Sequence, residues 1–418
     1  MLSILCLTYQ DSPPAVALAA EERSVTETRP RLFDAYIRRM FTRRPARTGF
    51  SQEQTLRWLS WLAYGMKQSS LSQLLVESIQ PDWLPSAGTR RLYKLAVALI
   101  AALPIGLLLG FGVAYPVLVS AFPTTGWFLQ PTTFSRLILS AGYELWAGIL
   151  LSTLLVIAFI SLRVYGLLPA LAGGLSYGLS FGRPFGSIYG LETGLVIGGS
   201  AALLVALLYT VIGTLVLRRS QARGDAVETA DKLDWSWSRF VAGFMVGSLP
   251  GFAFGALLWW GFRGEAFIPA FGTRFALTLA ITAGANVGVL LGFQARGVEQ
   301  TVRPNQGIRR SARNALGVAL AIWLSVGLPL GYLAALSWRL ALGPARSFEV
   351  GASVFAGIGL ALGLLTSLFF GSLACIQHAV LRLLLARSGL IPLRLVPFLD
   401  SAAERIFLQK VGGGYIFI

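Results

Sequence analysis

The chain has 418 residues, of which 55% are hydrophobic and 13% charged, and its formal net charge is +16 at pH 7. Soluble domains carry about 25% charged residues, so the composition excludes a soluble enzyme along the whole length. It also excludes a disordered chain, and two distant cysteines, Cys6 and Cys375, exclude a disulfide scaffold. A polytopic α-helical membrane protein with a modest polar part remains.

Residues 1–94 are polar and carry 13 of the 35 Lys and Arg residues. Apolar residues at helical spacing predict a first helix over 31–41. Its stripe consists of Leu32, Phe33, Tyr36, Ile37 and Met40. A second helix is predicted from Ser51, whose spacing to Gln54 is that of a capping box, and a third over 71–79. This region is interpreted as a small cytoplasmic helical domain.

The composition changes from residue 92 onward, where apolar runs reach the length that a bilayer core demands. Eight membrane segments are predicted, and together they form an all-α bundle. They are 95–121, 137–161, 165–181, 191–217, 240–262, 275–293, 314–337 and 350–374. The third is short and glycine-rich, which is typical of a tilted, re-entrant or buried segment.

The basic residues predict the orientation of these segments. With eight spans, 29 of the 35 Lys and Arg residues lie on the side of the two termini. By the positive-inside rule, both termini are expected in the cytoplasm and the bundle in the inner membrane. The topology thus explains the net charge, and no nucleic-acid partner is expected. The start of the chain has no basic segment typical of a signal peptide.

A weak internal repeat places proline inside three predicted helices, at 103–106, 249–251 and 328–331. Each stretch reads Leu-Pro followed by glycine, in the first helix of a predicted helix pair. Two interpretations stay open. Either one helical hairpin has been duplicated, as in many transporters, or the match is chance among residues that are common in such helices.

Known catalytic and cofactor motifs are missing from the sequence. It has no G-x-x-x-x-G-K-[ST] phosphate-binding loop. His378 is the only histidine, and one histidine with two distant cysteines cannot supply a tetrahedral metal site. We therefore expect no cofactor and no bound metal. His378 is interpreted as the cytoplasmic end of the last helix rather than a ligand or proton relay.

Three further polar residues in the predicted spans are functional candidates, because such residues are costly in a membrane. Glu144 lies between aromatic residues typical of the headgroup level. Glu192 begins a span, where a helix N-terminus favours negative charge. Asn286 is in mid-span, and interhelical hydrogen bonding explains it well. In each case the structural role is favoured over transport.

Small residues recur at a spacing that lets helices approach closely. The spacing occurs at Gly174, Gly178 and Gly182, and again at Gly359 and Gly363. It fits either packing within one chain or self-association, and packing within the chain is favoured.

The last residues return to a polar composition. An amphipathic helix is predicted over 395–408, three glycines end it, and 415–418 is a strand-like apolar run. An exposed apolar end is physically unusual. Both ends of the chain are therefore expected to be truncated.

Three blocks at the two ends carry a resemblance to a known family. They are residues 1–11, then 32–40 with 51–63, 66–68 and 79–84, and finally 398–418. The chain resembles the C-terminal part of bacterial membrane-anchored NACHT-domain proteins, which are STAND-class signalling NTPases. The membrane region resembles that family by its organisation alone.

The resemblance implies a non-catalytic region that anchors the signalling NTPase and transmits its state. Residues 1–91 resemble the end of a NACHT module, 92–386 form the bundle, and 387–418 form a cytoplasmic tail. Nucleotide is expected to act through an upstream module, because no nucleotide-binding residue can be carried over to this chain. The expected partner is the lipid bilayer, and self-association of the chain stays an open alternative. The alternative is a small-solute or lipid transporter or channel, and a membrane-embedded enzyme is a weaker third.

Overall fold

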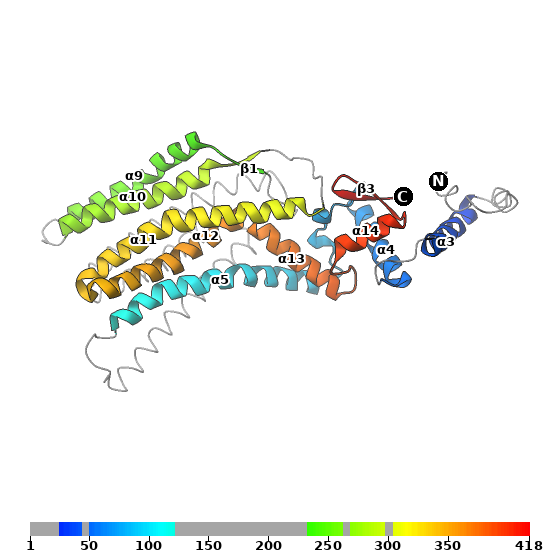
Figure 1. Cartoon of the computed structure of the whole chain (residues 1–418), viewed down its shortest axis with the longest axis horizontal. Coiled ribbons are helices and arrows are strands. Elements are labelled where there is room, and N and C mark those ends of the chain that lie inside the picture. The colour runs from blue at the N-terminus through cyan, green and yellow to red at the C-terminus, as the bar shows by residue number, and fades with distance from the viewer. Residues whose placement is uncertain (1–24, 44–49, 122–231, 262–267, 297–303) are drawn as a thin grey trace, which may run out of the picture. The chain divides into compact units, whose positions relative to one another are not determined.

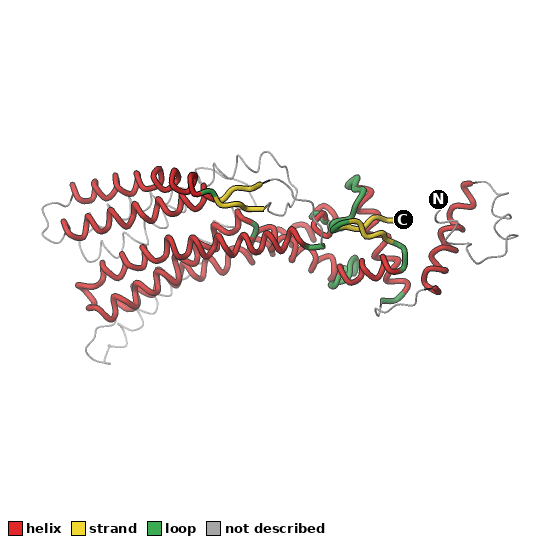
Figure 2. The backbone as a smooth tube through the Cα atoms, turned by 45° about the horizontal axis from the view of Figure 1, so that its top comes forward, coloured by secondary structure: helices red, strands yellow, loops and turns green. Residues whose placement is uncertain are grey.

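A computed structural model describes residues 25–43, 50–121, 232–261, 268–296 and 304–418. These residues are mostly helical, with two short two-stranded ribbons (Figure 2). The chain divides into two compact units. The terminal unit comprises Met1–Pro85, Gln300–Gln306 and Leu381–Ile418, and the helical unit comprises Ser86–Glu299 and Gly307–Val380.

The first two helices of the terminal unit confirm the sequence prediction. Helix α3 spans Val25–Arg43, and α4 spans Gln52–Gln68. The capping box at the start of α4 is formed in both directions: the Ser51 hydroxyl accepts from the Gln54 amide, and the Gln54 side chain accepts from the Ser51 amide. Two backbone amides at the helix start, which have no acceptor within the helix, are thereby hydrogen-bonded.

The predicted third helix over 71–79 is wrong. This stretch contains a single 3₁₀ turn, η1 (Val76–Ser78), and a second turn, η2 (Pro81–Trp83), follows it. Before η1 the backbone of Leu74 pairs with that of Tyr415, with N···O distances of 2.7 and 3.0 Å. Because this long-range pairing uses the amide and carbonyl of Leu74, they are not available to a helix.

The C-terminal segment forms a short helix followed by a hairpin. Helix α14 spans Leu395–Glu404, and the strands β3 (Leu408–Val411) and β4 (Gly414–Phe417) are antiparallel. This confirms both the amphipathic helix and the strand-like run. The turn between the strands uses Gly412 at φ 55°, a conformation that favours glycine. Tyr415 is fully buried.

The two ends of the chain are therefore parts of one unit. The indole ring of Trp58 packs edge-to-face on Phe398, with centroids 5.2 Å apart, and its Nε1 donates to the Gly389 carbonyl at 3.1 Å. Phe41 on α3 lies against Phe407, which follows α14. These contacts join segments more than 300 residues apart in sequence.

The helical unit contains the apolar helices of the chain (Figure 1). They are α5 (Ala87–Ala121), α9 (Trp237–Gly261), α10 (Ile268–Gly292), α11 (Gln306–Val354), α12 (Leu360–Ser367) and the first half of α13 (Ser372–Arg387), whose residues from Leu381 onward belong to the terminal unit. A π-helical turn, η3 (Phe355–Gly359), precedes α12, and a 3₁₀ turn, η4 (Leu368–Phe370), follows it. A short ribbon of β1 (Lys232–Trp235) and β2 (Phe293–Arg296) was not predicted.

Three described helical stretches are long and apolar enough to cross a membrane: Ala87–Leu108, Gln306–Leu336 and Pro344–Ser367. They coincide with the first, seventh and eighth predicted segments. The fifth and sixth predicted segments fall on α9 and α10. The second, third and fourth, over 137–217, lie outside the described residues.

The seventh and eighth segments are joined through α11, which reverses its direction. A straight helix rises about 1.5 Å per residue, which would put Gly331 and Gly351 about 30 Å apart. Instead, a Cβ built on Gly331 would lie 2.7 Å from the Gly351 carbonyl oxygen. The chain therefore turns back between Gly331 and Gly351, and α11 passes from there toward α12 in Figure 1.

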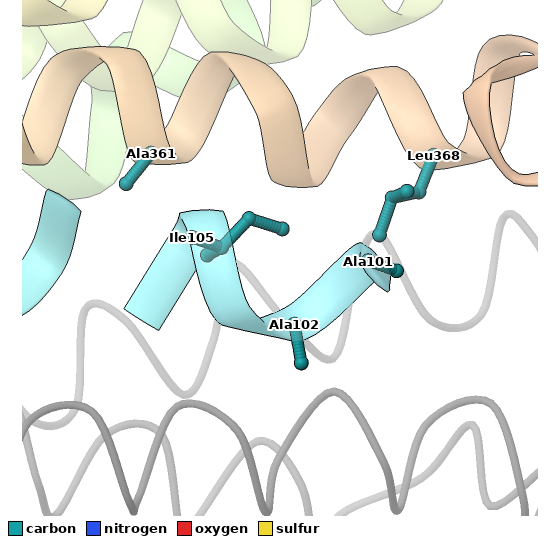
Figure 3. Packing of buried hydrophobic residues seen from close by; sticks show 5 residues of the cluster. All are labelled: Ala101, Ala102, Ile105, Ala361 and Leu368. Carbon is teal, nitrogen blue, oxygen red and sulfur yellow. The ribbon is translucent and has the colours of Figure 1, made fainter. Parts of the chain in front are cut away.

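Small side chains hold α5 close to the η3–α12 segment. The buried residues of this contact are Ala101, Ala102, Ile105, Ala361 and Leu368 (Figure 3). In a membrane, helices associate through close van der Waals packing rather than by leaving water. Alanine at most of these positions allows that approach.

Candidate functional site

Two exposed apolar stripes mark the surface of the helical unit. On α5, Leu95, Leu99, Leu103 and Leu107 recur at four-residue spacing, and each is about half exposed. A second stripe, on α11, consists of Leu316, Leu320, Leu324, Leu328 and Tyr332. Continuous apolar faces of this kind are adhesive in water and suited to lipid. They are compatible with a membrane protein.

A buried polar stripe lies on α10. Thr278, Thr282 and Asn286 follow each other at four-residue spacing, and each is at most 9% exposed. One turn further, Val289 packs against Val318 of α11. The stripe therefore continues a face of α10 that is buried in the bundle. Only Asn286 was predicted as a candidate, although the four-residue spacing of the threonines could have identified the rest.

The polar side chains of this stripe differ in their hydrogen bonds. The Thr282 hydroxyl donates to the Thr278 carbonyl at 2.7 Å, a hydrogen bond within the helix. The Asn286 carboxamide has no hydrogen bond to a residue in the described part of the chain. Its predicted interhelical hydrogen bond stays a prediction. Hydroxyls and an amide can bind a polar ligand, but they cannot relay protons as titratable groups do.

His378 lies on α13, past Ser367, where the third candidate span ends. Its imidazole is 2% exposed, and it interacts with at least one other group of the chain. One turn earlier, the Cys375 thiol donates to the Ile308 carbonyl at 3.5 Å, and burial raises its pKa. A raised pKa makes a thiol less reactive. Cys375 and His378 therefore lack the features of a nucleophilic site.

The other two predicted candidates, Glu144 and Glu192, lie outside the described residues. The same is true of the glycine series Gly174, Gly178 and Gly182. Only Asn286 and His378 of the four predicted candidates can therefore be placed in the structure.

The spacing of Gly359 and Gly363 does serve packing within the chain. A Cβ on Gly359 would lie 2.6 Å from the Gly327 Cα, and one on Gly363 would lie 2.5 Å from the Ala319 carbonyl oxygen. Both glycines thus let α11 and the η3–α12 segment touch at backbone distance. This confirms the favoured interpretation of the pair.

A second glycine contact, between α9 and α10, was not predicted. A Cβ on Gly247 would lie 2.7 Å from the Ala283 carbonyl oxygen, and one on Gly284 would lie 2.8 Å from that of Phe244. The pattern is present in the sequence, because Gly243 and Gly247 face Gly284 and Gly288 at four-residue spacing. The two helices run side by side in Figure 1.

The repeated prolines lie inside helices, as predicted. Pro104 is in α5, Pro250 in α9 and Pro329 in α11. Helices α9 and α10 form one hairpin, and α11 folds back to form another. The partner predicted for α5 lies outside the described residues, so the duplicated-hairpin hypothesis stays open.

The π-helical turn η3 is held by a tryptophan of α11. Trp323 stacks on Phe355 with ring centroids 5.0 Å apart, and its Nε1 donates to the Phe355 carbonyl at 3.0 Å. A π turn departs from the regular i→i+4 hydrogen bonding of an α-helix. The indole donates to the carbonyl at the start of this turn and so helps to hold the bulge in an apolar helix.

The terminal unit has two polar clusters. The Arg382 guanidinium donates to the Asn305 side chain, and burial lowers the pKa of Arg382 while nearby Glu77 raises it. Asp400 accepts from the Tyr415 hydroxyl and from Lys410 Nζ, both at 2.8 Å. Burial and the Asp400 hydrogen bond raise the pKa of Tyr415. Both clusters fix local structure.

Among the described residues, no group of three or more His, Cys, Asp or Glu side chains could hold a metal ion. The chain matches no protein-family model, no curated protein and no solved structure. The function is therefore argued from the residues alone.

Proposed function

We propose that this chain is a non-catalytic membrane anchor that transmits a signal as the C-terminal region of a NACHT-type signalling NTPase. The observation that carries the proposal is the pairing of the chain ends. Leu74 and Tyr415 share two backbone hydrogen bonds, while the apolar helices lie between them in sequence. The blocks that resemble the NACHT family are in these same ends.

In this proposal the bundle has about eight spans in the inner membrane, and both termini are cytoplasmic. Residues 1–91 and 387–418 attach the bundle to a nucleotide-binding module that this chain does not carry. The exposed leucine stripes of α5 and α11 support insertion in lipid. Coupling between nucleotide state and bundle passes through the terminal unit, and the helices themselves catalyse no step.

Two experiments test this proposal. Reading the coding DNA upstream of Met1 in frame should show a G-x-x-x-x-G-K-[ST] loop, and a stop codon directly before Met1 would overturn the NACHT assignment. The full chain, expressed in bacteria, should stay in the membrane fraction after alkaline carbonate washing. Recovery in the soluble fraction would overturn membrane anchoring.

A transporter or channel is the second candidate, and the buried Thr278, Thr282 and Asn286 stripe favours it. The Asn286→Leu variant separates the two. As an anchor, the variant should be at least as stable as the wild type, because an apolar side chain replaces an amide that has no hydrogen bond to a described residue. As a transporter, the wild-type chain should support solute flux in liposomes, and the variant should lose it.

A further inference from the structure

Exposed cations lie at one end of both apolar stripes of the helical unit. On α5, Arg91 is one turn before Leu95 on the same face, and Arg90 and Lys94 are also exposed. On α11, the exposed Arg309 and Arg313 precede Leu316 at helical spacing. Each helix thus presents a basic end that continues into a face suited to acyl chains.

The two basic ends lie at the same level of the bundle, because α5 and α11 pack against the same segment. Leu368 and Ala361 contact α5 around Ala101, and Gly363 contacts α11 at Ala319. Further along, Gly357 meets Gly112 of α5, and Gly359 meets Gly327 of α11. Both helices therefore run in the same direction against the η3–α12 segment.

From these contacts the levels of the cations follow. Arg91 precedes Ala101 by ten residues, and Arg309 precedes Ala319 by ten residues. At the rise of an α-helix, each arginine lies about 15 Å from the contact that its own helix makes with this segment, in the same direction. The cations of α5 and α11 thus form one band around the helical unit.

Within the described part of the helical unit, the cations of this band outnumber the acidic residues near them. The acidic residues in the described part of the helical unit are Asp234 and Glu349. Glu349 adjoins Gly351, which packs on Gly331, more than four turns along α11 from Arg313. No ion pair joins the five cations to any other described residue. Arginine and lysine at a membrane surface attract anionic lipids.

We propose that Arg90, Arg91, Lys94, Arg309 and Arg313, here named the basic belt, bind the headgroups of anionic phospholipids. The acyl chains of these lipids then lie along the leucine stripes of α5 and α11. The arginine guanidinium is suited to phosphate because its fork of N–H donors matches two phosphate oxygens. This inference rests on the proposed membrane anchoring and specifies the lipid class.

The test uses the full chain reconstituted in nanodiscs of mixed phosphatidylglycerol and phosphatidylcholine. Native mass spectrometry measures the ratio of the two lipids that stay bound. We expect the wild type to retain phosphatidylglycerol, and the R309Q/R313Q and R90Q/R91Q variants to lose the preference by about fivefold for each charge removed. R309K/R313K keeps the charge and should keep the preference.

The matched control is R57Q/K67Q, which removes two exposed cations of α4 outside the belt. It should keep the wild-type ratio. An equal loss in this control would show an effect of net charge and overturn the belt. So would a wild type without lipid preference. Carbonate extraction of the same samples checks insertion separately, so failure of anchoring is distinguishable from failure of the belt.

Discussion

The Tyr36 hydroxyl donates to the carbonyl oxygen of Ile406 at 2.6 Å, and Ile406 has φ 63°. A β-branched residue in this left-handed region is strained by about 1–2 kcal/mol. Ile406 follows the end of α14, where the amides of Ile406 and Phe407 bond to Ala403 and Ala402 in the pattern of a Schellman motif. Tyr36 and Phe407 thus stabilise a helix end at which glycine is usual.

Replacing Tyr36 by phenylalanine should loosen α3. The change removes the hydrogen bond to Ile406 but keeps the edge-to-face contact with Phe407. The expected loss is about 1 kcal/mol, measured as faster proteolysis of α3 in the full chain. Tyr64→Phe is the control, because Tyr64 is exposed. Equal proteolysis rates in the two variants would show that the Tyr36 hydroxyl does not hold α3.

Replacing Gly414 by alanine should break the pairing of the chain ends. A Cβ at this position would lie 2.6 Å from Gln73 Nε2 and 2.9 Å from the Leu74 carbonyl oxygen. Such overpacking costs about 1–3 kcal/mol. Hydrogen exchange of the Leu74 and Tyr415 amides should become faster, while exchange in α10 stays unchanged. Unchanged protection at Leu74 would contradict the pairing.

Two glycine-to-alanine variants in the helical unit should have opposite effects. Gly363→Ala forces a Cβ to 2.5 Å from the Ala319 carbonyl oxygen, so it should separate the helices and lower the melting temperature in detergent. Gly317→Ala meets nothing within 4 Å, and it should raise helix stability by about 1 kcal/mol. A neutral Gly363→Ala would show that these backbones are not in contact.

The Trp323→Phe variant tests the π-helical turn. It retains a ring to stack on Phe355 but removes the Nε1 donor to the Phe355 carbonyl. We expect a loss of about 1 kcal/mol in the thermal stability of the full chain. Trp237→Phe serves as the control, because Trp237 is 69% exposed. A Trp323→Phe variant no less stable than this control would exclude the indole as the support of the turn.

Tyr415 should make the terminal unit sensitive to alkali. Burial and Asp400 raise its pKa above the ordinary value of 10.0. The folded state therefore favours the protonated phenol, so its stabilising effect is complete below pH 10.0 and is lost as the pH rises above it. Tyr415→Phe should flatten this decline in a pH series of unfolding measurements. An equally steep decline in the variant would assign it to other groups.

Several local features were predictable from the sequence because neighbouring residues decide them. The capping box of Ser51 and Gln54 depends on a three-residue spacing, and the apolar run that became α5 depends on length and composition. The strand-like end at Tyr415 follows from its apolar residues and the preceding glycines. Asn286 could be placed inside an apolar helix for the same reason.

The tertiary structure alone decided which distant segments meet. Leu74 lies in an apolar stretch that suggests a helix, yet its backbone pairs with Tyr415, because a long-range partner can override local propensity. The reversal of α11 depends on the contact between Gly331 and Gly351, and the common level of Arg91 and Arg309 depends on their packing against one segment. A sequence determines helices and apolar faces through local spacing, whereas their partners depend on contacts across the whole chain.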